Sequence, residues 1–409
     1  MKRIYLLVAA FLSLGTVASA QTIEGFDFED KEVLFATPVK NQGGTSCCWG
    51  FAGLSMVESE IYRMTKREVD LSEMWIARHA YYEKAIRYVR MHGKTSYRAG
   101  GIVNDVMTII KKYGVVPEEA YKGLRYGTPK HQHGELVEAL RAYCNAVVAN
   151  KNGTLSTAWI RGLNGILDAY LGRVPKSFEY EGQTYTPQSF TEMLGFDPTA
   201  YVGVTSFECY PTNEWAQFEV PDNWMWNLMF NVELDDLRKM VSHSIEKGYT
   251  VAMACDITNL NFKKRPQVAL LPARNNKEIR TEDINRWPSI TREIRKNMRT
   301  FAEPIPEREV TAQRRNSSFL SYFTTDDHAM HIIGFAYDKN GTRYLKIKDS
   351  SHKDGKKGIG TLRYMSEPYM LYMSTSFLFH KDAVPAEILE KMGLTAKNDK
   401  VKKSSKKKK

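Results

Sequence analysis

Four residues of this 409-residue sequence carry the groups needed to break an amide bond: Cys48, His328, Asp349 and Gln42. Cys48 precedes a segment with helical periodicity at 49–64, and the N–H groups and dipole at the start of a helix favour a thiolate. His328 supplies a base, and Asp349 supplies a carboxylate to orient it. Gln42 lies six residues before Cys48 and can donate an amide hydrogen to a developing oxyanion.

A β-hairpin is needed to bring the base to its partner. Residues 330–337 are apolar, 338–341 form a turn signal, and 344–348 alternate between apolar and charged side chains. An antiparallel pair with this turn brings its two ends together. His328 is therefore expected within a few residues of Asp349.

The remaining segments divide into helical and strand-like regions. Residues 70–73 read as a helix start, and 102–112 as an amphipathic helix stopped by the glycine and proline that follow. The interpretation from 122 to 250 is mostly helical, with a strand at 249–254. Residues 257–327 are polar and dense in arginine, which predicts an elaborated surface excursion.

The composition is that of a globular protein, with 43% hydrophobic and 26% charged residues. The net charge of +11 is concentrated at the two ends, because without Lys2, Arg3 and the +7 of 397–409 only +2 is left. Nothing in the body indicates a specific nucleic-acid site. A rival hypothesis is an anion-binding protein that uses this lysine-rich end, although no aromatic residue is interleaved there for base stacking.

The N-terminus resembles a secretory signal. Lys2 and Arg3 precede an apolar run at 4–14, and the sequence Ala-Ser-Ala at 18–20 fits a cleavage site after Ala20. No later segment is apolar for long enough to serve as a membrane anchor. We expect an exported protein, periplasmic or secreted.

Neither a metal nor a cofactor is indicated. His328 and His331 lie three apart on a predicted strand, where their side chains face opposite sides, and 131–133 (His-Gln-His) has no third ligand nearby. A vicinal disulfide between Cys47 and Cys48 would form a redox latch, but a packed free thiol is the commoner situation. The cysteines are odd in number, with no C-x-x-C spacing: Cys47, Cys48, Cys144, Cys209 and Cys255.

The sequence resembles the papain-like cysteine peptidases, and within them the bleomycin hydrolase and aminopeptidase C branch. The resemblance implies that Cys48 is the nucleophile, that Gln42 forms the oxyanion hole, and that Trp49, Gly100 and Gly101 bind substrate. The blocks that carry it are 38–42 (PVKNQ), 48–52 (CWGFA), 71–73 (LSE), 100–101 (GG), 327–331 (DHAMH) and 344–351 (YLKIKDSS).

The branch is indicated by the 280 positions between Cys48 and His328, compared with roughly 130–150 in ordinary papain-like enzymes. The sequence departs from the family pattern at two positions. Asp349 occupies the place of the usual asparagine, and Ser351 that of a tryptophan. A carboxylate also accepts the His328 ring N–H, so activity is compatible with both changes. A pseudo-peptidase that acts as a binding protein is the alternative.

The resemblance implies an α+β, papain-like two-lobed fold, with a helical lobe, a β-barrel-like lobe and a large helical insertion. The expected divisions are a signal peptide (1–20), the lobe of the nucleophile (21–121), a helical insertion (122–250), the β-rich lobe of His328 and Asp349 (251–385) and a C-terminal arm with a Lys-rich tail (386–409).

The activity expected is that of an aminopeptidase acting on peptide substrates, and a homohexamer is implied by the resemblance. In this branch a C-terminal arm lies in the cleft and its carboxylate pairs with the amine of the substrate. Here the arm would run over 385–394, and the chain continues to Lys409. We expect this lysine-rich end to be trimmed. An endopeptidase with an open cleft is the alternative.

Overall fold

The computed structural model describes residues 23, 25–258, 261–262, 267–273, 303–350 and 361–394. The predicted signal peptide, Ser351 and the Lys-rich end lie outside these residues. Within the described part of the chain, no helix is long and apolar enough to cross a membrane. The described helices are α1 (Cys48–Thr65), α2 (Glu73–Arg90), α3 (Asn104–Tyr113), α4 (Gly134–Val148), α5 (Ala158–Leu171), α6 (Pro187–Met193), α7 (Leu234–Glu246), α10 (Ala312–Leu320), α11 (Glu367–Met373) and α12 (Ala386–Lys391).

One large mixed sheet forms most of the second lobe. Its strand order is β5-β6-β4-β12-β7-β9-β10-β11-β8, and β1 pairs with β9, while β2 and β3 form a separate hairpin. The strands are β1 (Glu29–Lys31), β2 (Phe178–Tyr180), β3 (Gln183–Tyr185), β4 (Tyr201–Thr205), β5 (Glu214–Gln217), β6 (Leu228–Asn231), β7 (Val251–Cys255), β8 (Val268–Ala269), β9 (His328–Tyr337), β10 (Arg343–Asp349), β11 (Thr361–Ser366) and β12 (Ser374–His380).

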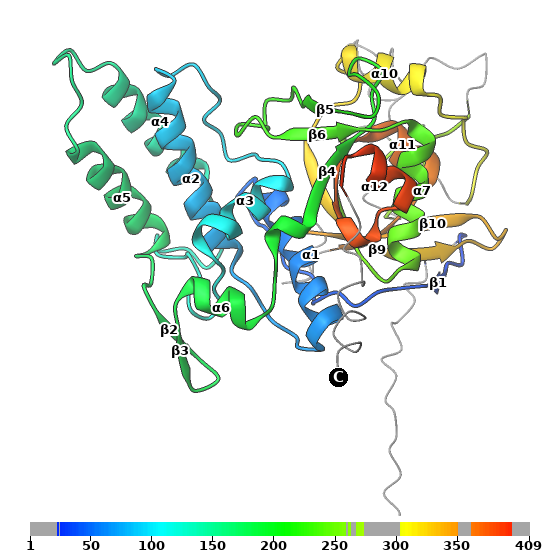
Figure 1. The fold of residues 1–409 in the computed structure, drawn as a ribbon, viewed down its shortest axis with the longest axis horizontal. Helices are drawn as coiled ribbons and strands as arrows, with labels where there is room; N and C mark the ends of the chain where they lie inside the picture. The colour runs from blue at the N-terminus through cyan, green and yellow to red at the C-terminus, as the bar shows by residue number, and fades with distance from the viewer. Residues whose placement is uncertain are drawn as a thin grey trace, which may run out of the picture.

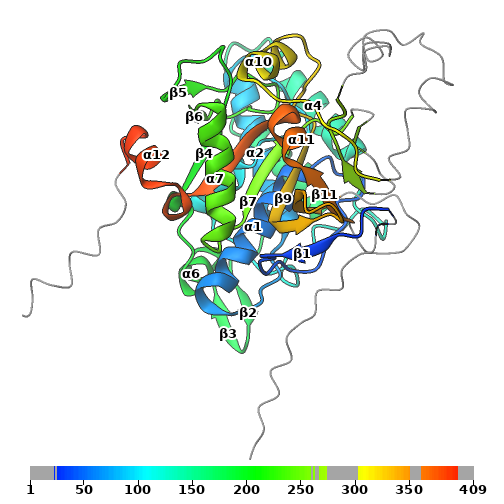
Figure 2. The same cartoon turned by 90° about the vertical axis from the view of Figure 1, so that its right-hand side faces the viewer.

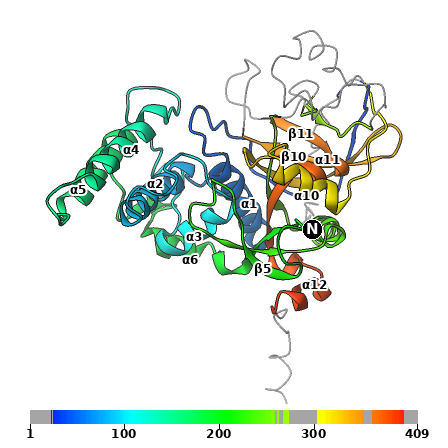
Figure 3. The same cartoon turned by 90° about the horizontal axis from the view of Figure 1, so that it is seen from above.

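Helix α1 lies between the two lobes, with α2 to α5 on one side and the sheet on the other (Figures 1 and 3). It is buried continuously from Trp49 to Ile61, because one face packs on the helices and the other on β7 and β9. The helix predicted at 49–64 is confirmed, and it ends at Lys66 in the left-handed conformation, with φ 62°.

The helical lobe follows its local signals. The hydroxyl of Ser72 caps α2 by accepting a hydrogen bond from the backbone N–H of Trp75, as the 70–73 pattern predicted. Helix α3 ends before Gly114, whose φ of 68° is costly for other residues and where a Cβ would lie 2.4 Å from the Pro187 carbonyl oxygen. Helices α4 and α5 pack on α2 at the outer edge of the lobe (Figure 3).

The hairpin that was expected to unite His328 and Asp349 is β9–β10. Arg343 pairs with Tyr337 next to the turn, and Lys348 pairs with His331 at the far end. The carboxylate of Asp338 accepts hydrogen bonds from two backbone N–H groups inside the turn, which fixes its shape. The register therefore places the first residue of β9 beside the last residue of β10.

Two expectations about domain organisation need correction. Residues 201–231 of the proposed helical insertion form β4, β5 and β6, and β4 pairs directly with β12. The sequence at 201–205 (YVGVT) is rich in β-branched residues, which favours a strand. Residues 386–391, expected as an arm in the cleft, form α12 instead. Ile388 and Leu389 belong to the same buried hydrophobic cluster as Leu237 of α7. Figure 2 shows α12 on the side of the lobe where α7 lies.

The packing of α1 on α3 leads to a stability prediction. A Cβ on Gly53 would lie 2.6 Å from Cγ2 of Val106, whereas a Cβ on Gly50 would meet nothing closer than 4.0 Å. We expect Gly53→Ala to lower the free energy of unfolding by about 1–3 kcal/mol through overpacking. Gly50→Ala, the matched control on the same helix, should leave it unchanged or raise it by up to about 1 kcal/mol. Urea denaturation measures both, and equal effects would contradict this account of the contact.

Candidate active site

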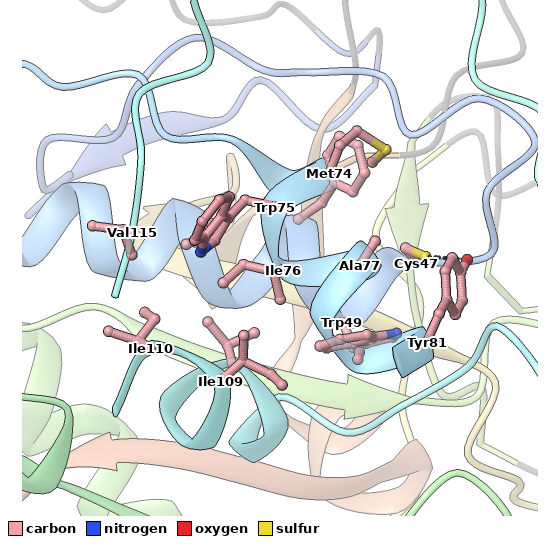
Figure 4. Packing of buried hydrophobic residues seen from close by; sticks show 14 of the residues in the cluster. Cys47, Trp49, Met74, Trp75, Ile76, Ala77, Tyr81, Ile109, Ile110 and Val115 are labelled. Carbon is pink, nitrogen blue, oxygen red and sulfur yellow. Dashed lines mark hydrogen bonds between the residues drawn. The ribbon is translucent and has the colours of Figure 1, made fainter. Parts of the chain in front are cut away.

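The two neighbouring cysteines lie in different environments. Cys48 is the first residue of α1 and is partly exposed, at the end where backbone N–H groups have no partner within the helix. Cys47 is buried, and its Sγ lies 3.2 Å from the hydroxyl of Tyr81 (Figure 4). Burial raises the pKa of the Cys47 thiol to about 11. Cys47 is therefore the packed thiol, and Cys48 is the one placed to react.

His328, Asp349 and Arg363 form a chain of contacts from β9 through β10 to β11. Nε2 of His328 lies 2.8 Å from Oδ1 of Asp349, and Nε of Arg363 lies 2.6 Å from Oδ2 of the same carboxylate. Asp349 is 0% exposed, so this carboxylate is neutralised by charged neighbours rather than by water. The proximity expected from the hairpin is present. Arg363 was missed, although an arginine within the apolar sequence of a strand is a detectable signal.

The charge on His328 is stabilised by its neighbours. Burial lowers the pKa of this imidazole, but hydrogen bonds to Asp349 and Cys48, together with the negative charges of both, outweigh burial and raise the pKa to about 10. Because Asp349 occupies Nε2, the other ring nitrogen, Nδ1, is the one available to Cys48. At neutral pH this favours the imidazolium form of His328, which places a positive charge beside Cys48.

Gln42 is tied to the residue after Asp349. The hydroxyl of Ser350 donates a 2.8 Å hydrogen bond to Oε1 of Gln42, and the backbone N–H of Gln42 donates to the Ser350 carbonyl at 3.0 Å. The amide oxygen is thereby occupied, and the Nε2 hydrogens are left to act as donors. These bonds join the loop before α1 to the end of β10, so the two lobes meet beside Cys48.

The glycine pair is required by close packing. A Cβ on Gly101 would lie 2.8 Å from the Trp49 ring, and one on Gly100 would lie 2.1 Å from a carboxylate oxygen of Asp222. The Trp49 indole donates a hydrogen bond of 3.1 Å to the Ala99 carbonyl. This segment therefore runs directly beside the start of α1.

Two of the other histidines singled out from the sequence have side-chain partners. Nδ1 of His133 lies 2.7 Å from the Tyr81 hydroxyl, and Nδ1 of His331 lies 2.9 Å from Oγ of Ser55. The His131 carbonyl accepts a hydrogen bond from the backbone N–H of Gly44. Among the residues that the structure describes, no three histidine, cysteine or acidic side chains are grouped to hold a metal ion.

Residues 23–163 match the papain family cysteine protease domain. Over this stretch the chain is similar to the papain family of cysteine proteases. PepW from Lactobacillus rhamnosis HN001 shares its fold, with a TM-score of 0.62 at 17% identity over 89% of this chain and 84% of that one. The predicted two-lobed α+β, papain-like fold is therefore confirmed.

Two curated relatives of this chain are distant in sequence. Procathepsin L of Felis catus is 26% identical over 164 residues, which are 40% of this chain and 46% of that protein. Aminopeptidase C of Lactococcus lactis subsp. cremoris is 24% identical over 263 residues, 54% of this chain and 59% of that protein. The chain thus spans about half to three fifths of the length of the curated relatives it matches. The predicted similarity to aminopeptidase C is confirmed, at 24% identity.

The shared carboxylate leads to a prediction about the titration of His328. Arg363→Met removes the positive charge that competes for Asp349, so we expect the pKa of His328 to rise. Asp349→Asn should lower this pKa. Arg363→Met should change the pKa of His328 less in the Asp349→Asn protein than in a protein that keeps Asp349. An NMR titration of the buried His328 imidazole measures this pKa in a Cys48→Ala background, where no thiolate contributes.

The same shift has a consequence for stability. Because the folded-state pKa of about 10 lies above the ordinary value of 6.5, the folded protein binds this proton more tightly than the unfolded chain. The contribution of His328 to the free energy of unfolding is complete below pH 6.5 and is lost as the pH rises through about 10.

An unchanged His328 titration in Arg363→Met would show that Arg363 does not control the charge of Asp349.

Proposed function

We propose that this papain-family peptidase hydrolyses peptide bonds with Cys48 as the nucleophile and His328 as the general acid and base. The observation that carries the proposal is the contact of His328 with both Asp349 and Cys48, which raises the pKa of the imidazole to about 10. A thiolate formed under these conditions needs no further activation. A non-catalytic binding protein has no requirement for such an ion pair.

The reaction follows from these positions. The Cys48 thiolate attacks the carbonyl carbon and forms a carbon–sulfur bond, while the carbonyl oxygen gains negative charge beside the Gln42 amide. His328 gives its Nδ1 proton to the leaving nitrogen, and the carbon–nitrogen bond breaks. Water then attacks the thioester, and His328 takes a proton from that water. Release of the acid restores the Cys48 thiolate and the His328 imidazolium.

Arg363 explains how an aspartate can replace the asparagine of the family. An isolated carboxylate would hold the imidazolium too strongly for it to release its proton to the leaving group. Arg363 takes one oxygen of Asp349 at 2.6 Å and leaves the other for His328. The pair presents His328 with an acceptor of reduced charge, closer to the neutral amide that it replaces.

We expect Cys48→Ala to lower turnover about a thousandfold or more, since no other group replaces the nucleophile. Cys47→Ala is the matched control and should keep most of the activity, because its thiol packs against Tyr81. Hydrolysis of fluorogenic peptides by the purified protein measures both, and mass spectrometry after iodoacetamide treatment identifies the labelled residue. A Cys48→Ala protein with wild-type rates would contradict the assignment. A Cys48 that resists alkylation would favour a pseudo-peptidase.

For the mode of cleavage, we propose aminopeptidase activity. The relatives named Aminopeptidase C support it, and so do two carboxylates near the site. Asp222 lies against Gly100, and Asp326 lies two residues before His328. Burial, and next the charge of Asp222, raise the pKa of Asp326 to about 7. A substrate ammonium bound near both would relieve that repulsion.

Paired substrates test this mode of cleavage. We expect kcat/KM for peptides with a free N-terminus to exceed that for their N-acetylated forms by about tenfold or more, which corresponds to one ionic contact. Asp222→Asn should reduce the preference, whereas Asp235→Asn, a change at an exposed aspartate of α7, should leave it intact. Efficient cleavage of acetylated peptides would favour an endopeptidase with an open cleft.

A further inference from the structure

A buried lysine beside the candidate active site has no part in the chemistry described so far. Lys84 lies on α2 and is 2% exposed. Its ammonium donates a 2.7 Å hydrogen bond to the carbonyl of Arg98 and a second hydrogen bond to the carbonyl of Gly100. A buried ammonium is costly unless its donors are used, so these two bonds account for its place in the core.

Two tryptophan rings enclose the same ammonium. The centroid of the Trp224 ring lies 5.3 Å from Nζ of Lys84, and that of Trp49 lies 6.0 Å away. Aromatic faces attract a cation, most strongly where water is excluded. Burial lowers the pKa of Lys84, and the charges of Asp105 and Asp222 offset part of that shift. The position of Lys84 is therefore fixed from several sides.

Lys84 and Trp49 together bind three successive carbonyls. Lys84 holds those of Arg98 and Gly100, and the indole of Trp49 holds that of Ala99 between them. In a regular extended strand, successive carbonyls point to opposite sides. The chain has a bend at 98–99, which allows all three to be bound. The bend is thus maintained by side chains of α1 and α2.

The segment that follows the bend has little freedom of its own. Gly100 is confined by Asp222 and Gly101 by Trp49, as the crowding at their missing Cβ positions shows. Glycine backbone is otherwise the most flexible in a protein. An extended substrate that pairs with such a backbone binds well only if the backbone is already in place.

We propose that Lys84 is a positioning residue that holds the Gly100–Gly101 segment in the shape that binds the substrate backbone. The inference rests on the proposed peptidase function and deepens it, because it identifies what makes the glycine pair rigid. Lys84 does not touch the reacting atoms. It acts on the substrate through the carbonyls that it binds.

The test compares Lys84→Met with the wild-type protein, using whichever free or acetylated peptide the wild type cleaves better. We expect KM to rise about tenfold or more and kcat to change less than about threefold, the size expected for losing a hydrogen bond from a charged donor. The rate of Cys48 alkylation by iodoacetamide, which needs no backbone pairing, should stay within about twofold. Loss of this charge also removes an interaction that lowers the pKa of Asp222. The KM of an acetylated peptide, which has no ammonium to bind there, therefore separates loss of backbone positioning from loss of charge.

Two further variants keep the test decisive. Trp49→Phe retains a ring but removes the donor to the Ala99 carbonyl, so its KM should also rise, even if Lys84→Met does not fold. Lys346→Met is the matched control. Lys346 is as buried as Lys84, but it pairs with Asp30 and not with the glycine segment. The KM of the Lys346→Met protein should therefore be unchanged.

The outcomes separate the inference from the proposed function. An active wild-type protein with unchanged KM in both Lys84→Met and Trp49→Phe overturns the inference alone. A parallel loss of iodoacetamide reactivity in a folded Lys84→Met protein also overturns it, because the role would then be general to the site. A wild-type protein that cleaves neither peptide overturns the proposed function itself.

Discussion

The arrangement of the site depends on one carboxylate that is shut off from water. Asp349 is placed between an imidazole and a guanidinium, and each takes one of its oxygens. A buried charge is tolerated only if its neighbours compensate it, so exchanging one partner changes the charge balance of the other. The strands β9, β10 and β11 must then keep their register to within a residue, since a shift of one residue would turn His328 or Arg363 to the opposite face.

A second set of polar contacts joins the two lobes across α1. Glu58 is buried on this helix and accepts hydrogen bonds from the backbone N–H of Leu71 and from the hydroxyl of Thr37. That hydroxyl also accepts a bond from Lys348 on β10. Ser55, one turn earlier, contacts His331 on β9. Contacts with both lobes thus fix the position and the rotation of the helix that begins with Cys48. The thiol therefore has little freedom to move away from His328.

The sequence was sufficient for those parts of the site that depend on local signals. The start of α2 at Ser72 and the approach of His328 to Asp349 follow from a capping residue and from a turn, and both act over a few positions. Lys84 could not be found in this way, and for Arg363 the sequence marks a cation within an apolar strand but not the carboxylate that it binds. Their roles arise from contacts between separate elements, and no periodicity records which carbonyl or carboxylate a buried cation will meet. Residues 201–231 were misread because only 201–205 has a strand-like sequence of its own. Strands β5 and β6 are short and are stabilised by pairing with each other and with β4, which in turn pairs with β12.

The pairing of β4 with β12 also covers a strand edge that would otherwise be open. Strand β12 (Ser374–His380) has a buried sequence with two phenylalanines and a leucine, and without β4 one side of it would be an open edge. Unpaired apolar edges recruit strands from other molecules and lead to aggregation. By adding β4, β6 and β5 in turn, the inserted segment moves the edge outward to a four-residue strand with glutamate, alanine and glutamine beside its tryptophan. The insertion is therefore a cover for the sheet, and a shorter chain would need another means of guarding β12 from self-association.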